Sequence, residues 1–323
     1  METGKTIKSK TLFFLYEWNA WWSPLSRAQK ILPLVVALAY PTMILVLSNL
    51  TKLGGLRTDH FFTAAAGAGL WYLGPRLRSI FYFLLPLLLV GVVYDSMRYY
   101  SDLIRGPIHV SEPYHFDQYF FGINTSDGRL TPNEWFQKHT HPILDVISGF
   151  FYLCFIPIYV LICAYFCFEV SRVKNLHGRF RPMWAFFWVN ILGYSTYYWY
   201  AAAPPWYVAQ YGIGPADLHV AASAAGAARF DSIFGTHFFT GMYGRAADVF
   251  GAIPSLHVAY PMLAVFYAFR YGALRIFSLF FYLTMCFSAV YLNHHYILDI
   301  LWGSSYALLV CSLLSAIPRS QVQ

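Results

Sequence analysis

The sequence has little charge: Asp, Glu, Lys and Arg together make up 11% of its 323 residues, while 58% of the residues are hydrophobic. A soluble domain of this size would not need so much apolar surface, because it must also present polar side chains to water. The apolar residues fall in repeated runs that approach the length of a membrane-crossing helix. We therefore predict an all-α, polytopic transmembrane helical bundle and an integral, multi-pass membrane protein.

The sequence also lacks patterns that are typical of metal sites. Its five cysteines all lie in apolar runs without metal-ligand spacing, and we interpret them as small buried hydrophobes. Four polar residues, His109, Glu112, His115 and Asp117, match no standard ligand pattern, and we interpret them as part of a solvated loop. We therefore expect neither a metal nor a cofactor.

Basic residues outnumber acidic residues by 22 to 15, but they occur singly or in short groups near the ends of apolar runs. This placement is typical of positive-inside topology and contact with anionic lipids, so we expect no nucleic-acid partner. No cleavable signal peptide is expected. The segment from Thr11 to Pro24 is amphipathic, and Trp18, Trp21 and Trp22 favour a helix lying at the membrane surface.

Eight transmembrane helices are predicted, near residues 30–49, 61–75, 79–97, 142–168, 183–203, 256–271, 274–292 and 296–317. The second is short and rich in alanine and glycine, so tilting, re-entry and absence of a full crossing all stay open. The predicted organisation is a cytoplasmic or interfacial amphipathic segment, an N-terminal transmembrane hairpin, a six-helix catalytic core and a cytoplasmic tail, at 1–29, 30–78, 79–318 and 319–323.

The distribution of lysine and arginine predicts the sidedness of these helices. An eight-span arrangement places the basic clusters on one face, which should be cytoplasmic. The opposite face then carries two long loops, 98–141 and 204–255, together with the segment from His294 to Asp299. Long loops are often functional, so we expect the active site on this non-cytoplasmic, lumenal or periplasmic face.

Two histidines and an aspartate lie within or beside the apolar runs, at His257, His295 and Asp299. Ionisable side chains at membrane depth are costly, so they indicate function. His295 and Asp299 are four residues apart and would share one face of a helix, where the carboxylate can orient the imidazole. Pro254 and Ser255 precede an apolar run, so a helix N-terminus and a hydroxyl should be available there to bind phosphate.

These residues carry a family resemblance. Ser255-Leu-His257 and His295-Tyr-Ile-Leu-Asp299 resemble the second and third signatures of the type 2 phosphatidic acid phosphatase superfamily. Over roughly residues 190–310 the chain is similar to the fungal inositol phosphorylceramide synthase branch of that superfamily. The segments that carry this second similarity are Pro204-Pro-Trp-Tyr207, Ala228-Arg-Phe-Asp231, Phe234-Gly235, Gly251-Ala-Ile-Pro-Ser-Leu-His257 and His294-His-Tyr296.

The resemblance implies a lipid phosphotransferase that moves a phospho-headgroup, such as phosphoinositol from phosphatidylinositol, to a lipid alcohol such as ceramide and releases diacylglycerol. It implies that His295 attacks phosphorus to form a phospho-histidine and that Asp299 fixes the tautomer of His295. It also implies that His257 protonates the leaving alkoxide and then activates the incoming hydroxyl. Ser255 and nearby backbone amides would stabilise the charge on the transferring phosphate.

The chain departs from the phosphatase pattern in the positions of its cations. The arginine that usually lies seven residues before the histidine of the third signature is replaced by Ser288. The string from Lys174 to Arg181-Pro182 matches the first signature, but the apolar span 183–203 separates it from His257, and we interpret the match as chance. We predict instead that Arg229 supplies the cation near the phosphate. Weaker candidates are Arg98, Arg105, Lys138 and Arg245.

Four further residues are candidates for substrate binding. Pro205, Trp206 and Tyr207 could form a platform for the headgroup, or could end a helix at the membrane interface. His294 could contact substrate or serve in packing. The partners implied are membrane lipids, namely a phospholipid donor and a lipid alcohol acceptor, and an accessory membrane subunit is left open. The alternatives are a lipid phosphate phosphatase with water as acceptor and a non-catalytic lipid-binding or transport protein.

Overall fold

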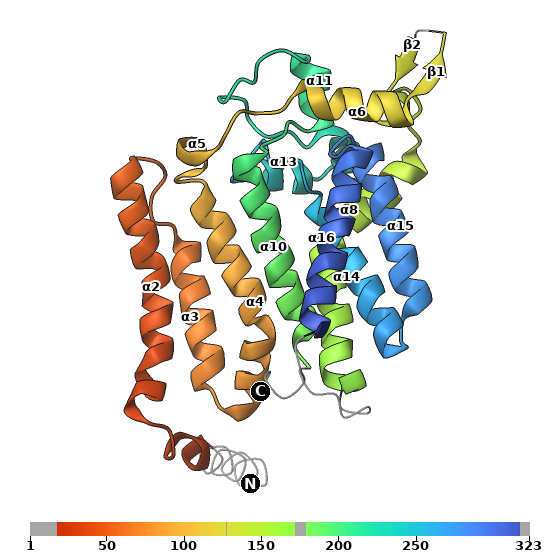
Figure 1. The fold of residues 1–323 in the computed structure, drawn as a ribbon. Helices are drawn as coiled ribbons and strands as arrows, with labels where there is room; N and C mark the ends of the chain where they lie inside the picture. The colour runs from red at the N-terminus through yellow and green to blue at the C-terminus, as the bar shows by residue number, and fades with distance from the viewer. Residues whose placement is uncertain (1–17, 127, 172–178, 317–323) are drawn as a thin grey trace. The chain divides into compact units, whose positions relative to one another are not determined.

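The computed structural model describes residues 18–126, 128–171 and 179–316. Helices make up nearly all of the described secondary structure (Figure 1). The chain divides into two compact units, with the first ending at Tyr99 and the second beginning at Tyr100. The predicted tail 319–323, most of the predicted segment 1–29, and Lys174 lie outside the described residues.

The first unit contains three long helices, α2 (Arg27–Thr51), α3 (Thr58–Tyr72) and α4 (Pro75–Met97). Ser26 starts α2 with a capping box in which its hydroxyl and the Gln29 side chain satisfy each other's backbone N–H groups. Ahead of it, residues 18–22 are helical. The indole of Trp18 stacks on that of Trp22 and donates to the Tyr72 carbonyl at 2.9 Å, which ties this short turn to the end of α3.

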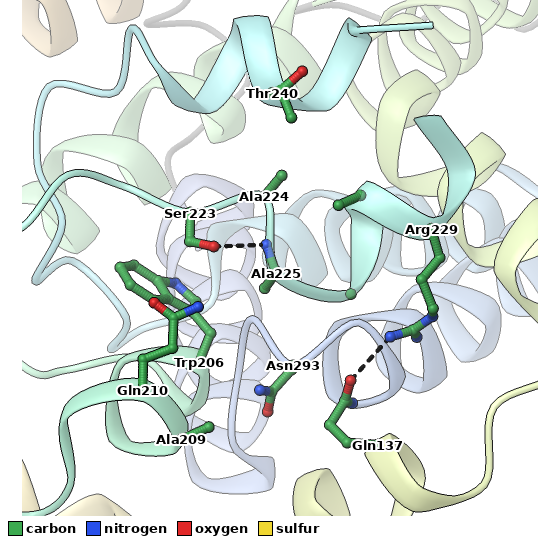
Figure 2. Close-up of a pocket in the computed structure, with 12 residues that line it drawn as sticks. Gln137, Trp206, Ala209, Gln210, Ser223, Ala224, Ala225, Arg229, Thr240 and Asn293 are labelled. Carbon is green, nitrogen blue, oxygen red and sulfur yellow. Dashed lines mark hydrogen bonds between the residues drawn. The ribbon is translucent and has the colours of Figure 1, made fainter. Parts of the chain in front are cut away.

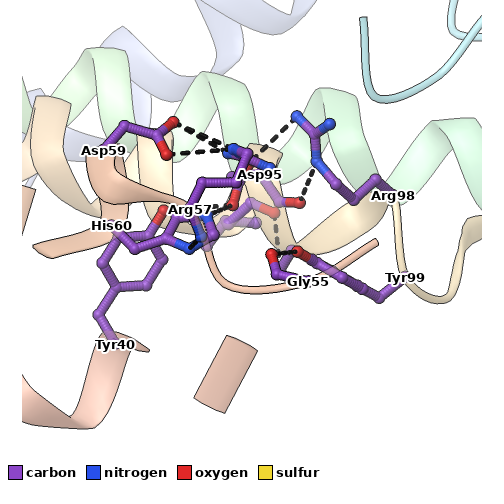
Figure 3. Close-up of polar contacts among 10 residues, drawn as sticks. Tyr40, Gly55, Arg57, Asp59, His60, Asp95, Arg98 and Tyr99 are labelled. Atoms are coloured by element: carbon purple, nitrogen blue, oxygen red, sulfur yellow. Dashed lines mark hydrogen bonds and ion pairs between the residues drawn. The ribbon is translucent and has the colours of Figure 1, made fainter. Parts of the chain in front are cut away.

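A cluster of ionisable side chains joins the three helices of the first unit (Figure 3). The carboxylate of Asp95, on α4, accepts from Arg57 at 2.6 Å and from Arg98 at 2.9 Å. The same carboxylate lies 3.0 Å from the fully buried ring of His60 on α3, and Tyr40 on α2 donates to it at 3.2 Å. The Asp95 carboxylate therefore serves as a common acceptor for groups from all three helices.

The second unit is a helical bundle with a layer of short elements at one end (Figure 1). Its long helices are α8 (Pro142–Ala164) with the π-helical continuation η1 (Tyr165–Val170), α10 (Arg181–Trp199), α14 (Leu256–Tyr271), α15 (Arg275–Tyr291) and α16 (Ile297–Ala316). Helix α14 packs against α8, α10, α15 and α16, and it is therefore the centre of the bundle. Its inward residues, including Leu263 and Ala264, are almost completely buried.

The layer of short elements is built from the two long loops. The first loop contributes α5 (Ser101–Ile104), α6 (Ser111–Phe121), β1 (Ile123–Thr125), β2 (Gly128–Leu130) and α7 (Pro132–Lys138). The second loop contributes α11 (Pro205–Tyr211), the 3₁₀ turn η2 (Ala225–Ala227), α12 (Ala228–Phe234) and α13 (Phe238–Tyr243). The two strands form an antiparallel hairpin in which Ile123 pairs with Leu130.

Backbone bridges join the two loops to each other. Ala202 forms parallel bridges both to His109 in the first loop and to Gly251 in the second. For this reason α10 ends at Trp199, although the sequence predicts a helix as far as residue 203. The chain is extended after the helix because residues 201–203 pair with other segments, and because Pro204 and Pro205 cannot donate helical hydrogen bonds.

The described helices correspond to all eight predicted spans, with ends that differ by a few residues. Four of them are long and apolar enough to cross a membrane: Arg27–Thr51, Leu77–Met97, Pro142–Val170 and Ile297–Ala316. Helix α15 is apolar but shorter. The all-α prediction is confirmed, and the protein is an integral membrane protein. The predicted division into a hairpin, 30–78, and a six-helix core, 79–318, concerns which helices catalysis requires and stays a prediction.

Candidate active site

The structure brings together the three residues predicted to be catalytic. His257 lies in the first turn of α14, His295 in the turn between α15 and α16, and Asp299 in the first turn of α16. The Nε2 atom of His295 is 3.1 Å from Nδ1 of His257, and Nδ1 of His295 is 3.1 Å from an oxygen of Asp299. Asp299 is fully buried and His295 nearly so, which makes this a polar cluster inside the bundle.

The predicted arrangement of His295 and Asp299 on one helix face is wrong in detail. Helix α16 begins at Ile297, so His295 precedes the helix. The Asp299 carboxylate reaches back to the imidazole and also accepts from the Tyr296 backbone N–H at 3.0 Å. The contact therefore forms because the carboxylate folds over the start of its own helix, as a capping side chain does.

A backbone carbonyl fixes the tautomer of His295. Its Nδ1 lies 3.0 Å from the Ala252 carbonyl oxygen as well as near Asp299. A carbonyl can only accept, so Nδ1 must carry the proton, and Nε2 of the neutral ring holds a lone pair. Since Nε2 lies beside Nδ1 of His257, the latter must be the donor in that contact. The arrangement places a nucleophilic nitrogen next to a proton donor.

The turn that carries His295 has an unusual backbone, which other segments hold in place. Asn293 adopts the left-handed conformation with φ of 64°, and the N–H groups of His294 and His295 both donate to the Ala289 carbonyl. The Asn133 amide in α7 donates to the carbonyls of Val290 at 3.1 Å and His295 at 3.0 Å. One amide side chain thus bridges both sides of the turn.

Asp117 holds the start of the next helix. Its two carboxylate oxygens accept from the backbone N–H groups of Ile297 at 2.7 Å and Leu298 at 3.0 Å. These are among the N–H groups at a helix start that lack a partner within the helix. Asp117 is fully buried, so its interpretation as part of a solvated loop is wrong. Burial raises the pKa of Asp117 to about 7, although the two N–H donors act to lower it.

No sequence signal indicated the roles of Asn133 and Asp117, because their partners are backbone groups more than 150 residues away. The other polar residues of that segment are accessible to solvent, as predicted, but Glu112 and His115 lie in α6 and not in a loop. His109 and Glu112 form a partly exposed pair at 3.0 Å, and His115 is exposed. Within the described ranges there is no cluster of His, Cys, Asp and Glu suited to a metal ion.

Ser255 lies at the N-terminus of α14, as predicted, and is fully buried. Its backbone N–H donates to the Asp299 carbonyl at 2.9 Å, and its hydroxyl has no hydrogen-bond partner in the described part of the chain. Gly303 of α16 lies against the Ser255 backbone so closely that a Cβ atom at that position would collide with it. The absence of a side chain at residue 303 therefore lets the two helices meet at the site.

Arg229 shares the outer layer with the histidines but forms an ion pair of its own. Its Nε donates to Asp145 at 2.6 Å, and its Nη1 donates to Gln137 at 3.0 Å. Arg181 starts α10, whose far end approaches the site through a contact of 3.5 Å between the Tyr197 hydroxyl and the Pro254 carbonyl. Because α10 has 19 residues, Arg181 lies about 25 Å along the helix axis from that contact.

His294 is part of an aromatic column. Its ring stacks on Tyr243 with centroids 4.6 Å apart and on Tyr152 at 5.2 Å, and Tyr152 in turn stacks on His257 at 4.3 Å. The His294 Nε2 atom donates to the Ala224 carbonyl at 3.1 Å. Burial lowers the pKa of His294 to about 3, so its ring is neutral at neutral pH.

The predicted platform residues start α11. Pro205, Trp206 and Tyr207 are all buried, and the Tyr207 hydroxyl accepts from the Asp217 N–H at 2.8 Å. Trp206 also lines a cavity of about 340 Å³, which Figure 2 shows between α7, α11, α13 and the segment that leads to α12. Arg229 lies on the opposite side of the same cavity. Two of the residues predicted for substrate binding thus share one cavity.

Comparison with known proteins agrees with the geometry. Residues 128–313 match the model of the PAP2 superfamily. The chain is 38% identical over 261 residues to the phosphoinositol dihydroceramide synthase of Bacteroides thetaiotaomicron, an alignment that covers 79% of this chain and 83% of that protein. It is 29% identical to the inositol phosphorylceramide synthase catalytic subunit of Schizosaccharomyces pombe and 28% identical to that of Saccharomyces cerevisiae.

Each yeast alignment covers 73% of this chain, but only 54% of the fission yeast protein and 57% of the budding yeast protein. No solved structure gives a significant match. The family match spans the paired histidines and the aspartate, and the bacterial match extends over most of the chain. The chain therefore belongs to the PAP2 superfamily.

Proposed function

We propose that this protein is a phosphotransferase that moves phosphoinositol from phosphatidylinositol to a ceramide-type lipid alcohol and releases diacylglycerol. The observation that carries the proposal is the contact of His295 with both Asp299 and His257, because it supplies a nucleophile, an orienting group and a proton donor. The names of the bacterial and yeast relatives, which are phosphoinositol dihydroceramide and inositol phosphorylceramide synthases, support the choice of headgroup and acceptor.

The reaction has two in-line steps in this proposal. In the first, Nε2 of His295 attacks phosphorus, the bond from phosphorus to the diacylglycerol oxygen breaks, and His257, acting as an imidazolium, gives a proton to that oxygen and becomes neutral. In the second, His257 takes the proton of the acceptor hydroxyl, whose oxygen attacks phosphorus while the bond to His295 breaks. Asp299 and the Ala252 carbonyl hold the Nδ1 proton throughout, so the lone pair stays on the reacting nitrogen.

Other residues would bind the substrate. The unpaired Ser255 hydroxyl and the first N–H groups of α14 can donate to phosphate oxygens as negative charge develops on them. Arg229, Pro205, Trp206 and Tyr207 are assigned to the headgroup side of the site. For His294 we propose indirect substrate binding: its stacking holds the aromatic wall beside His257.

We propose further that the active site lies on the non-cytoplasmic face. The short elements that hold His257 and His295 come from the two long loops, and Arg181, Arg270 and Arg275 lie at the opposite ends of α10, α14 and α15. Two yeast relatives are named catalytic subunits, which supports proposing an accessory membrane subunit as a partner.

The test is mass spectrometry of the products that purified protein makes from mixed phospholipids, with and without ceramide. A phosphoinositol-ceramide product together with diacylglycerol is expected, and both should disappear in His295→Ala. If inositol phosphate or inorganic phosphate is released equally with and without ceramide, the reaction is hydrolysis and not transfer. If the protein binds lipids but turns over no phospholipid, it is a lipid-binding or transport protein and not an enzyme.

A further inference from the structure

The cavity beside the histidine turn has amide and hydroxyl side chains in a wall that is otherwise formed by Trp206, Arg229 and small residues (Figure 2). Its volume of about 340 Å³ is at the lower end of the range for small-ligand sites, and it suits one ring-sized group better than a lipid tail. The polar residues of the wall come from five separate parts of the second unit: Gln137, Gln210, Ser223, Arg229, Thr240 and Asn293.

Several of these polar groups have unused hydrogen-bonding capacity. The side-chain amides of the exposed Gln210 and the buried Asn293 form no hydrogen bond with any other described residue, and each can both donate and accept. Ser223 accepts from the Ala225 N–H at 3.0 Å, and the structure gives its own hydroxyl proton no acceptor among the described residues. A ligand with several hydroxyl groups could satisfy these donors and acceptors together.

The one charge in the described part of the wall is already paired, and this favours a polyol over a phosphate as the ligand. Among the described residues that line the cavity, Arg229 is the one with a cationic side chain. It lies 2.6 Å from the Asp145 carboxylate and also donates to Gln137. An anion would have to compete with Asp145 for the guanidinium, and an ammonium group would find no carboxylate in the wall. A neutral ring that carries hydroxyl groups needs neither charge.

The cavity adjoins the nucleophile. Asn293 precedes His295 by two residues, so their Cα atoms can be no more than about 7 Å apart. Ala224, on the other side of the cavity, accepts the hydrogen bond from the ring of His294. The segment 293–295 therefore links the cavity wall to the turn that carries the reacting nitrogen.

We propose that this cavity binds the uncharged polyol ring of the donor phospholipid, with Gln210, Asn293 and Ser223 as hydrogen-bonding residues that select the headgroup. The inference rests on the proposed transfer of a phospho-headgroup and adds where that headgroup is recognised. It assigns the phosphate itself to the histidines and Ser255, outside the cavity.

The test compares kinetics of purified full-length variants in detergent micelles, with phosphatidylinositol as donor and a fluorescent ceramide as acceptor. Gln210→Met removes an amide at nearly constant length, and Asn293→Gly removes an amide while tolerating the left-handed backbone. Each should raise KM for phosphatidylinositol about fivefold and leave kcat within about twofold, because a lost neutral hydrogen bond weakens ground state and transition state alike. Gln29→Met makes the same change in the exposed capping box of α2, outside the cavity, and is the control for loss of an amide elsewhere; it should leave both constants unchanged.

Two soluble phosphodiesters distinguish the polyol from the phosphate. Glycerophosphoinositol should inhibit the wild type more strongly than glycerophosphoethanolamine does, and the two variants should lose this preference. Unchanged KM in both variants, or equal weakening of both inhibitors, would overturn the proposal.

If the wild type transfers no headgroup, the proposed function fails, and the cavity is tested by direct binding of glycerophosphoinositol. Binding that Gln210→Met weakens would uphold the cavity assignment. If glycerophosphoinositol does not bind to the wild type, the cavity assignment is wrong.

Discussion

The position of one proton on His295 determines the chemistry available at the site. We predict that His295→Ala abolishes turnover, because the attacking nitrogen is lost. Asp299→Asn should lower kcat by about 10²-fold or more, and should leave some activity because the Ala252 carbonyl still holds the Nδ1 proton. Both are measured as kcat per folded molecule. Activity like that of the wild type in a well-folded His295→Ala protein would contradict the phospho-histidine mechanism.

Arg229, on α12, and Arg181, at the start of α10, should differ in their effect on catalysis. Arg229→Ala should lower kcat by about tenfold, because it leaves the Asp145 carboxylate buried without its cation and disturbs the cavity wall. Arg181→Ala should leave kcat nearly unchanged, since Arg181 lies at the far end of α10. The comparison is made at matched membrane insertion. If Arg181→Ala is inactive while Arg229→Ala is active, the Lys-x6-Arg-Pro string is the first signature after all.

Asp117 should affect rate more than substrate binding. In Asp117→Asn the side-chain NH₂ group faces one of the two backbone N–H groups, of Ile297 and Leu298, that now donate to the carboxylate. Two donors repel each other, so the start of α16 and the Asp299 carboxylate should shift. We expect kcat to fall about tenfold with KM little changed. Glu112→Gln, an exposed change on the same helix, is the control and should be silent. A parallel rise in KM in Asp117→Asn would point to general loosening of the outer layer.

The same carboxyl group gives stability a pH dependence. The pKa of Asp117 is about 7 in the fold against an ordinary value of 3.8, so the folded state binds the proton more tightly. Its stabilising contribution is complete below about pH 4 and is lost as the pH rises through 7. Thermal unfolding of the wild type should show this decline, and Asp117→Asn should lack it.

At the scale of helices, the first unit depends on the Asp95 cluster in Figure 3. We predict that Asp95→Ala destabilises the protein by about 3 kcal/mol, because the buried ring of His60 and the partly exposed Tyr40, Arg57 and Arg98 all lose the carboxylate that they share. Asp59→Asn removes an exposed partner of Arg57 and should cost less than about 1 kcal/mol. Unfolding temperatures of the two variants provide the measurement, and equal shifts would show that the cluster is not a buried network.

The helices were predictable because their apolar runs are long and are bounded by proline, glycine and basic residues. The turns between them were less so. Residues 200–203 read as the end of an apolar helix, and only pairing with His109 and Gly251 makes that segment extended. The left-handed backbone at Asn293 likewise depends on contacts with Ala289 and Trp206.

The site was predictable to the extent that its chemistry resides in side chains. His257, His295 and Asp299 could be identified because ionisable groups are rare in this chain and lie in family signatures. Asn133, Asp117 and Ala252 could not be identified, because they act on backbone atoms or through a carbonyl. Such roles leave no pattern in residue type and emerge only when distant segments are brought together.

For the whole molecule, we predict that activity persists in excess chelator. The nucleophile, the orienting carboxylate and the proton donor are all assigned to side chains, so the proposed steps use no metal. Turnover is measured before and after treatment with EDTA, with inactive His295→Ala as the background. Loss of activity that one specific divalent cation restores would require a metal-assisted step.

The sequence separation between Asp117 and its partner Ile297 also determines how late in synthesis their hydrogen bond can form. The two residues are 180 positions apart. At ribosomal rates of about 5–20 residues per second, Asp117 leaves the ribosome roughly 10–40 s before its helix partner does. During that interval the Asn133 amide lacks the backbone carbonyls to which it donates, and the Asp117 carboxylate lacks the backbone N–H groups from which it accepts. The outer layer therefore cannot complete its contacts until α16 is made. Ribosomes that stall ahead of α16 should yield incompletely folded chains that are degraded.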